Sequence, residues 1–75
     1  MTTDQLDAKG LICPLPVLKA RRAMKPLAAG DLLEVEATDP GSVKDFAHFC
    51  ETTGHRLVSS SQDGDVFQFV IEKTG

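Results

Sequence analysis

Residues 32–54 read LLEVEATDPGSVKDFAHFCETTG and contain the signals of a strand, a turn and a helix in direct succession. At their start, Leu33, Val35 and Ala37 alternate with Glu34 and Glu36. Alternation with a period of two places each set of side chains on its own face of a strand. We therefore predict a strand over residues 32–38, with one buried face and one wet face.

The rest of this stretch predicts an amphipathic helix. Asp-Pro-Gly-Ser closes the strand, and either Asp39 or Ser42 is suited to cap the helix that follows. The apolar residues that recur at i, i+3, i+4 and i+7 are Val43, Phe46, Ala47 and Cys50. Such a stripe is typical of a helix that buries one side, and Gly54 is placed to end it.

Downstream, the sequence predicts a β-hairpin. Residues 66–72 give the clearest strand signal, with Phe67, Phe69 and Ile71 on one face and Gln68 and Glu72 on the other. An Asp-Gly turn joins this strand to a short strand at residues 56–60.

Upstream, apolar residues at three- and four-residue steps predict a helix within residues 14–27. We expect it to end near Lys25, because Pro26 disfavours helical geometry in the residue before it. A weaker signal predicts a strand at residues 5–8.

The predicted order is β-α-β-α-β-β, which favours an α/β (α+β) two-layer sandwich. Crossover helices imply some parallel pairing, whereas the hairpin is antiparallel. We thus expect a four-stranded mixed sheet with two helices on one face. The polar side chains expected on the other face are Glu34, Glu36, Gln68 and Glu72.

The chain has 75 residues, a net charge of −3 and two cysteines. These values predict one small domain over residues 1–75, with little room for a deep pocket. They exclude a generally basic nucleic-acid binder and a disulfide scaffold. Because we find no secretory signal and no apolar run near the ~20 residues that span a bilayer, we expect a cytoplasmic protein with reduced thiols.

The charges are divided unevenly along the chain. Residues 8–30 hold five bases and no acid, whereas the remaining residues hold all 11 acids and three bases, a net charge of −8. The basic side chains of the first predicted helix are Lys19, Arg21, Arg22 and Lys25. They form either a solvated helix face or a docking surface for an acidic partner or a phosphate backbone.

Cys13 stands directly before this helix, in the motif Cys13-Pro14-Leu15-Pro16. Each proline is a possible start of the helix, and the sequence does not decide between them. Both starts place Cys13 within about a turn of the helix N-terminus, whose partial positive charge favours a thiolate. We therefore expect a thiol that loses its proton readily. The alternative is an inert, buried cysteine.

The other candidate side chains favour structural roles. Cys50 belongs to the predicted buried stripe, although spacing alone does not exclude a disulfide with Cys13. A zinc site from both cysteines, His48 and His55 is disfavoured, since His48 and Cys50 face different directions on a helix. We expect a solvated His48, and a His55 that contacts the end of the second helix.

The chain resembles the TusA/SirA-like family of small sulfur-carrier proteins over residues 6–73. The resemblance rests on the Cys-Pro-x-Pro motif at the start of the first helix. It extends to Leu6-Asp7-Ala8-Lys9-Gly10-Leu11, Gly30-Asp31, Asp39-Pro40, Asp45, Gly54-His55 and Phe67-Gln68-Phe69. It implies a fold similar to the C-terminal domain of bacterial translation initiation factor three.

The resemblance also implies a function. Cys13 would accept a sulfane sulfur as a persulfide and relay it, with Pro14 and Pro16 setting its geometry. The implied donor is a cysteine desulfurase or a rhodanese, and the acceptor is a protein with a reactive cysteine. Family members serve tRNA thiolation, molybdenum-cofactor assembly or sulfur oxidation. We expect a monomer with no metal, no organic cofactor, no membrane contact and no direct nucleic-acid contact.

The sequence is also compatible with two other functions. A non-catalytic binding module would use the basic first helix to dock an acidic protein or RNA, although it lacks exposed aromatic side chains for stacking. A metal-trafficking protein would need a second ligand close to Cys13, where the sequence offers proline.

Overall fold

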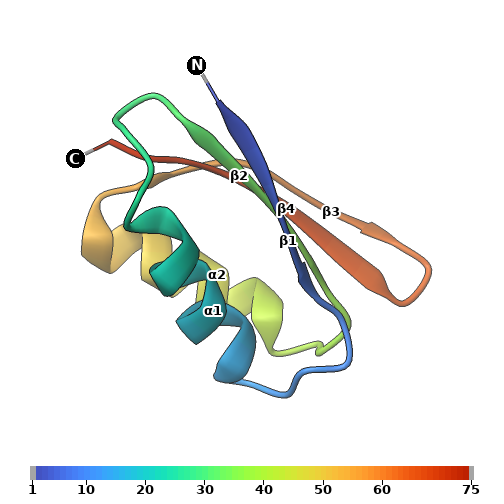
Figure 1. The fold of residues 1–75 in the computed structure, drawn as a ribbon. Coiled ribbons are helices and arrows are strands. Elements are labelled where there is room, and N and C mark those ends of the chain that lie inside the picture. Colours follow the sequence, from blue (N-terminus) through green and yellow to red (C-terminus); the bar gives the residue numbers. More distant parts are fainter. Residues whose placement is uncertain (1, 75) are drawn as a thin grey trace.

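The computed structural model describes residues 2–74 and contains four strands and two helices (Figure 1). In chain order these elements are β1 (Thr3–Ala8), α1 (Leu15–Met24), β2 (Leu32–Ala37), α2 (Ser42–Thr53), β3 (Arg56–Asp63) and β4 (Val66–Glu72). The β-α-β-α-β-β prediction is confirmed. The main differences are at two strands, since β1 begins two residues earlier and β3 ends three residues later than predicted.

The strands form one mixed sheet in the order β1-β2-β4-β3. β1 and β2 are parallel, whereas β4 is antiparallel to both of its neighbours. Both helices cover the same face of the sheet (Figure 1), which confirms the two-layer α+β sandwich. Because β1 and β2 run in the same direction side by side, the loops that follow them leave the sheet at the same end.

The core fills the space between the sheet and the two helices. Phe46 of α2 and Phe69 of β4 are buried and stack with their ring centroids 4.6 Å apart. Phe49 meets Phe46 edge-on at 6.5 Å. The strands contribute their inward-facing alternate residues, namely Ala8, Leu33, Val35, Ala37 and Ile71. These positions confirm the alternation predicted for β2 and β4.

The buried side of α1 differs from the apolar pattern in the sequence. Pro16, Ala20 and Met24 are buried at four-residue steps, whereas Leu15 and Leu18 are 48% and 51% exposed. The side of α1 that carries Pro16, Ala20 and Met24 therefore faces the core, and this orientation turns both leucines to solvent.

The buried stripe of α2 was predicted only in part. Phe46 and Cys50 are buried as expected, but Val43 is 41% exposed and Ala47 is exposed too. Phe49 takes a place in the core that the sequence pattern did not assign to it. The apolar residues of α2 extend over more of its circumference than it buries, so periodicity alone did not fix the inward side.

Both ends of α2 are formed by glycine residues and not by capping side chains. Gly41 is the N-cap residue and no side chain caps it, so the predicted capping by Asp39 or Ser42 is wrong. At the other end, Gly54 adopts φ 82° and donates its N–H to the carbonyl of Cys50 at 3.0 Å. Glycine adopts this left-handed conformation without the cost that a Cβ would add.

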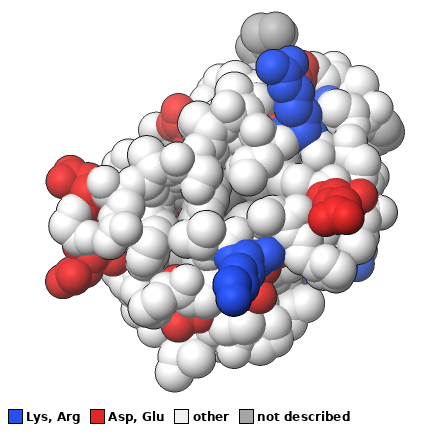
Figure 2. Space-filling view, turned by 180° about the vertical axis from the view of Figure 1, so that it is seen from behind, with Lys and Arg blue, Asp and Glu red and all other residues white. Residues whose placement is uncertain are grey.

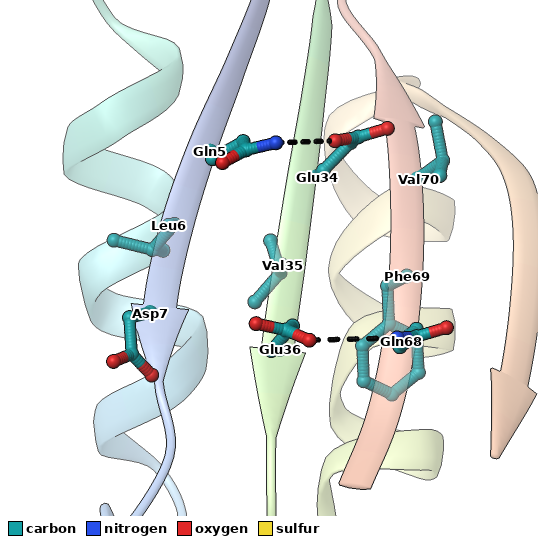
Figure 3. A pocket seen from close by; sticks show the side chains of 9 residues that line it. All are labelled: Gln5, Leu6, Asp7, Glu34, Val35, Glu36, Gln68, Phe69 and Val70. Carbon is teal, nitrogen blue, oxygen red and sulfur yellow. Dashed lines mark hydrogen bonds between the residues drawn. The ribbon is translucent and has the colours of Figure 1, made fainter. Parts of the chain in front are cut away.

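The uncovered face of the sheet is polar, as predicted. Gln5 donates to Glu34 at 3.2 Å, and Gln68 donates to Glu36 at 3.4 Å (Figure 3). These side chains border a hollow of about 530 Å³, which is larger than we expected of so short a chain. Its lining includes no cysteine and no histidine.

Charged side chains are dispersed on the side opposite to the view of Figure 1, and most of that surface is uncharged (Figure 2). Neither helix in residues 2–74 has the length and apolar character that a membrane span requires.

Candidate functional site

Cys13 lies in the loop between β1 and α1, and its side chain is exposed. Pro14 is the N-cap residue of α1, Leu15 is the first helical residue and Pro16 follows in the first turn. The first helical hydrogen bond runs from the N–H of Leu18 to the carbonyl of Pro14 at 3.1 Å. The helix thus starts between the two predicted positions, and Cys13 lies just outside its N-terminus.

The loop between β2 and α2 holds the backbone of Cys13. Asp39 accepts a hydrogen bond from the Cys13 N–H through Oδ2 at 3.0 Å. Gly41 leaves room for this contact, because a Cβ at that position would lie 3.1 Å from Asp39 Oδ2 and 3.7 Å from the Cβ of Cys13. The Asp39 side chain therefore binds the backbone of the β1–α1 loop and does not cap α2.

The side chain of Cys13 is held by α2. Its Sγ donates to Oδ2 of Asp45 at 2.5 Å, and Asp45 lies in the first turn of α2. Two carboxylates from the β2–α2 region thus converge on one cysteine, because the parallel β1 and β2 deliver both loops to the same end of the sheet.

This arrangement overturns the expected acidity of the thiol. The hydrogen bond to Asp45 is the largest cause that raises the pKa of Cys13, followed by partial desolvation and by the negative charges of Asp45 and Asp39. The prediction of a readily ionised thiol counted only residues near Cys13 in the sequence. The field of the helix N-terminus is opposed here by carboxylates that the fold brings in from residues 39 and 45.

The same two carboxylates change the expectation about metal ligands. Within residues 2–74, the side chains that converge as possible ligands are those of Cys13, Asp39 and Asp45, with ligand atoms within 4.8 Å of one another. The fold therefore brings two carboxylates close to Cys13, where the sequence showed only proline. Soft thiolate and hard carboxylate oxygens favour different metals, so this donor set points to no particular ion.

Exposed apolar side chains lie next to Cys13 along the chain. They are Ile12, Leu15 and Leu18, which we call the apolar rim, and Ile12 is 71% exposed. The periodicity of α1 identified both leucines as helix residues but gave no signal that they face solvent. An apolar surface of this kind beside an exposed thiol is suited to contact with another protein.

A groove of about 240 Å³ adjoins the site between α1 and α2. Its lining consists of Pro14, Val17, Arg21, Asp45, His48, Phe49 and Thr52. The guanidinium of Arg21 lies 5.7 Å from the ring centroid of Phe49, in the range of a cation–π contact. Arg21 is the one residue of the predicted basic set in this lining; Lys19 and Arg22 are exposed elsewhere on α1, and Lys25 is exposed at its C-cap.

The remaining candidates take the structural roles predicted for them. Cys50 is buried and unpaired, and burial raises the pKa of its thiol. His48 is exposed, whereas the ring of His55 lies 5.9 Å from that of Phe49 near the end of α2. Burial, with a smaller contribution from Lys73, lowers the pKa of His55.

Comparison with known proteins gives consistent matches over almost the whole chain. The sequence model of the sulfurtransferase TusA family matches residues 4–73. The sulfur carrier protein TusA of Allochromatium vinosum is 49% identical over 71 residues, which cover 95% of this chain and 93% of that protein. The sulfur carrier protein TusA of Pseudomonas putida is 44% identical over 68 residues, covering 91% and 85%.

The fold has a solved counterpart. The crystal structure of a SirA-like protein from Desulfitobacterium hafniense superposes with a TM-score of 0.80 at 27% sequence identity and covers 100% of both chains. The two-layer arrangement described above is therefore shared along the entire length of that protein.

Proposed function

Because this chain belongs to the TusA sulfurtransferase family, we propose that it is a sulfur carrier whose Cys13 holds the transferred sulfur as a persulfide. The observation that carries this proposal is the exposed thiol of Cys13 beside the N-terminus of α1. Cys50 is 6% exposed and packs in the core, so a partner protein has no comparable access to it.

Sulfur transfer at this site is an exchange between a thiol and a persulfide. Cys13 gives up its proton, its Sγ attacks the outer sulfur of the donor persulfide, and the donor's sulfur–sulfur bond breaks. The donor cysteine leaves as a thiolate and takes up a proton, so there is no net oxidation or reduction. An acceptor thiolate then repeats this step on the outer sulfur held by Cys13. Neither step requires a metal or an organic cofactor.

The proposed partners are proteins. The donor is a cysteine desulfurase or a rhodanese, and the acceptor carries a reactive cysteine in tRNA thiolation, cofactor assembly or sulfur oxidation. Pro14 and Pro16 restrict the backbone beside the reacting sulfur. The apolar rim offers contact area, while the basic side chains of α1 would accelerate encounter with an acidic partner.

An RNA-binding module receives less support from the surface. Stacking on bases needs exposed aromatic rings, and Phe69 of β4 is buried. The uncovered face of the sheet presents the carboxylates of Glu34 and Glu36, which repel phosphate groups.

The experiment that tests the proposal is loading followed by mass spectrometry. The full chain is mixed with a persulfide donor, and the intact mass is measured without reductant. We expect wild type and Cys50→Ser to gain one sulfur atom, and Cys13→Ser to gain none. Loading of Cys13→Ser at Cys50 would contradict the assignment. Stoichiometric binding of zinc or copper(I) that depends on Cys13, without sulfur loading, would favour a metal carrier instead.

A further inference from the structure

The hydrogen bond between Cys13 and Asp45 exists only while the cysteine is an unloaded thiol. Sγ is the donor to Oδ2 at 2.5 Å, so the contact requires the S–H proton. A carboxylate offers acceptors only, and a thiolate offers no donor in return. Removing the proton therefore replaces an attraction by the repulsion of two negative charges.

Loading with sulfur removes this proton as well. In the persulfide, Sγ is bonded to Cβ and to the outer sulfur, and it carries no hydrogen. The outer sulfur of an ionised persulfide is an anion close to the carboxylates of Asp39 and Asp45. The side chain loaded with an ionised persulfide thus has no hydrogen bond to offer Asp45 and is repelled by it.

We propose that Asp45 is a positioning residue that holds the unloaded Cys13 as a protonated thiol and releases it when the cysteine carries sulfur. This inference rests on the proposed carrier function and concerns how the two states of the carrier differ. Asp45 acts through the donor atom of Cys13, whereas Asp39 binds the backbone N–H and keeps its partner in both states.

The titratable and charged groups at and beside the site come from α1, α2 and the β2–α2 loop. Asp39 lies in the β2–α2 loop, Asp45 and His48 lie on α2, and Arg21 of α1 lines the groove beside Asp45. Hydrogen bonding and charge from Asp45, with the charge of Asp39, raise the pKa of Cys13. Arg21 and His48 are not among the causes of this shift.

The functional consequence is a carrier that reacts poorly on its own. At neutral pH the protonated thiol is a weak nucleophile toward small electrophiles and oxidants. A donor protein that displaces the Asp45 carboxylate, or neutralises it, frees the thiolate at the moment of transfer. Loaded and unloaded carriers then differ in the position of one side chain at the surface that partners contact.

The test measures the reactivity of Cys13 without any sulfur donor. The full chain is alkylated with iodoacetamide over a range of pH, and modification of Cys13 is followed by peptide mass spectrometry. Asp45→Asn keeps the size of the side chain but removes its charge. We expect its alkylation profile to shift to lower pH, with a severalfold faster rate at neutral pH. Asp45→Glu should restore much of the wild-type profile.

Glu51→Gln is the matched control, because Glu51 is an exposed acid on the same helix and the substitution removes the same charge. It should leave the profile of Cys13 unchanged. An Asp45→Asn profile that equals wild type, or shifts to higher pH, in a protein with unchanged circular dichroism would overturn the inference. If Asp45→Asn does not fold, wild type in urea provides the comparison. Unfolding separates Cys13 from Asp45, so its profile should then shift to lower pH, and an unchanged profile would overturn the inference.

A second experiment tests whether Asp45 releases Cys13 when the cysteine is loaded with sulfur. The carboxyl carbon of Asp45 is followed by NMR in the unloaded chain and after Cys13 is converted chemically to a persulfide with polysulfide. We expect the Asp45 signal to move and that of Glu51 to stay. An unmoved Asp45 signal in fully loaded protein would contradict release. Failure of the proposed function would appear as absent loading by a donor protein and would leave the alkylation result unaffected.

Discussion

Replacement of Cys50 by serine separates the structural cysteine from the proposed carrier cysteine. Cys50 is 6% exposed and belongs to the core cluster of α2 and the sheet. Burying a hydroxyl without a good partner costs about 1–3 kcal/mol. On a helix the hydroxyl can bond the carbonyl four residues earlier, here that of Phe46, which offsets part of this cost. We therefore expect Cys50→Ser to lower the free energy of unfolding by about 1–2 kcal/mol.

That loss is large for a chain of this size. At roughly 0.05–0.15 kcal/mol per residue, 75 residues correspond to a total of about 4–11 kcal/mol. A loss of 1 kcal/mol lowers the melting temperature of such a small domain by about 4–8 °C. Urea unfolding under reducing conditions, followed by circular dichroism, measures the change directly.

The control for this substitution is Ala47→Ser, which places the same hydroxyl on the exposed side of α2. Its effect should stay within about 0.5 kcal/mol. Equal effects of the two substitutions would refute the placement of Cys50 in the core. Loss of sulfur loading in folded Cys50→Ser would refute the assignment of carrier chemistry to Cys13 alone.

Two further predictions concern pH and salt. The pKa of Cys13 is raised by its bond to Asp45, and that of Cys50 by burial, so the unfolded chain ionises first as the pH rises. The free energy of unfolding should stay constant below the ordinary thiol pKa of about 8.5 and fall above it. This fall should be smaller in Cys50→Ala. A urea midpoint that rises at alkaline pH would contradict the prediction. Substitution of Lys19 or Arg22 by Gln should slow loading from an acidic donor protein a few-fold at low salt, with the difference disappearing at high salt. Arg56→Gln on β3 is the control, and an equal slowing by it would show that α1 has no special role.

The alternation and periodicity of the sequence predicted the order of the elements and the architecture. Strand alternation is a strong signal because one face of β2 and β4 is buried and the other is wet. Burial of one face places an apolar side chain at every second residue. The sides of the helices were harder to predict. In α1 apolar residues occur on more than one side, and the structure buries the side of Ala20 and Met24 while Leu15 and Leu18 face solvent. Packing against the sheet, which no local pattern encodes, made that choice.

The candidate site shows the same division. The motif identified Cys13 and its place before a helix, because prolines restrict the backbone locally. The charges around the sulfur could not be predicted from the neighbouring sequence, because the basic residues that follow Cys13 are not the groups that act on its thiol. Parallel pairing of β1 and β2 brings Asp39 and Asp45 to it across 26 and 32 residues of chain. The sequence alone pointed to the sulfur atom that we propose as the carrier; the tertiary structure decided which charges surround it, because electrostatic interaction depends on distance in space and not along the chain.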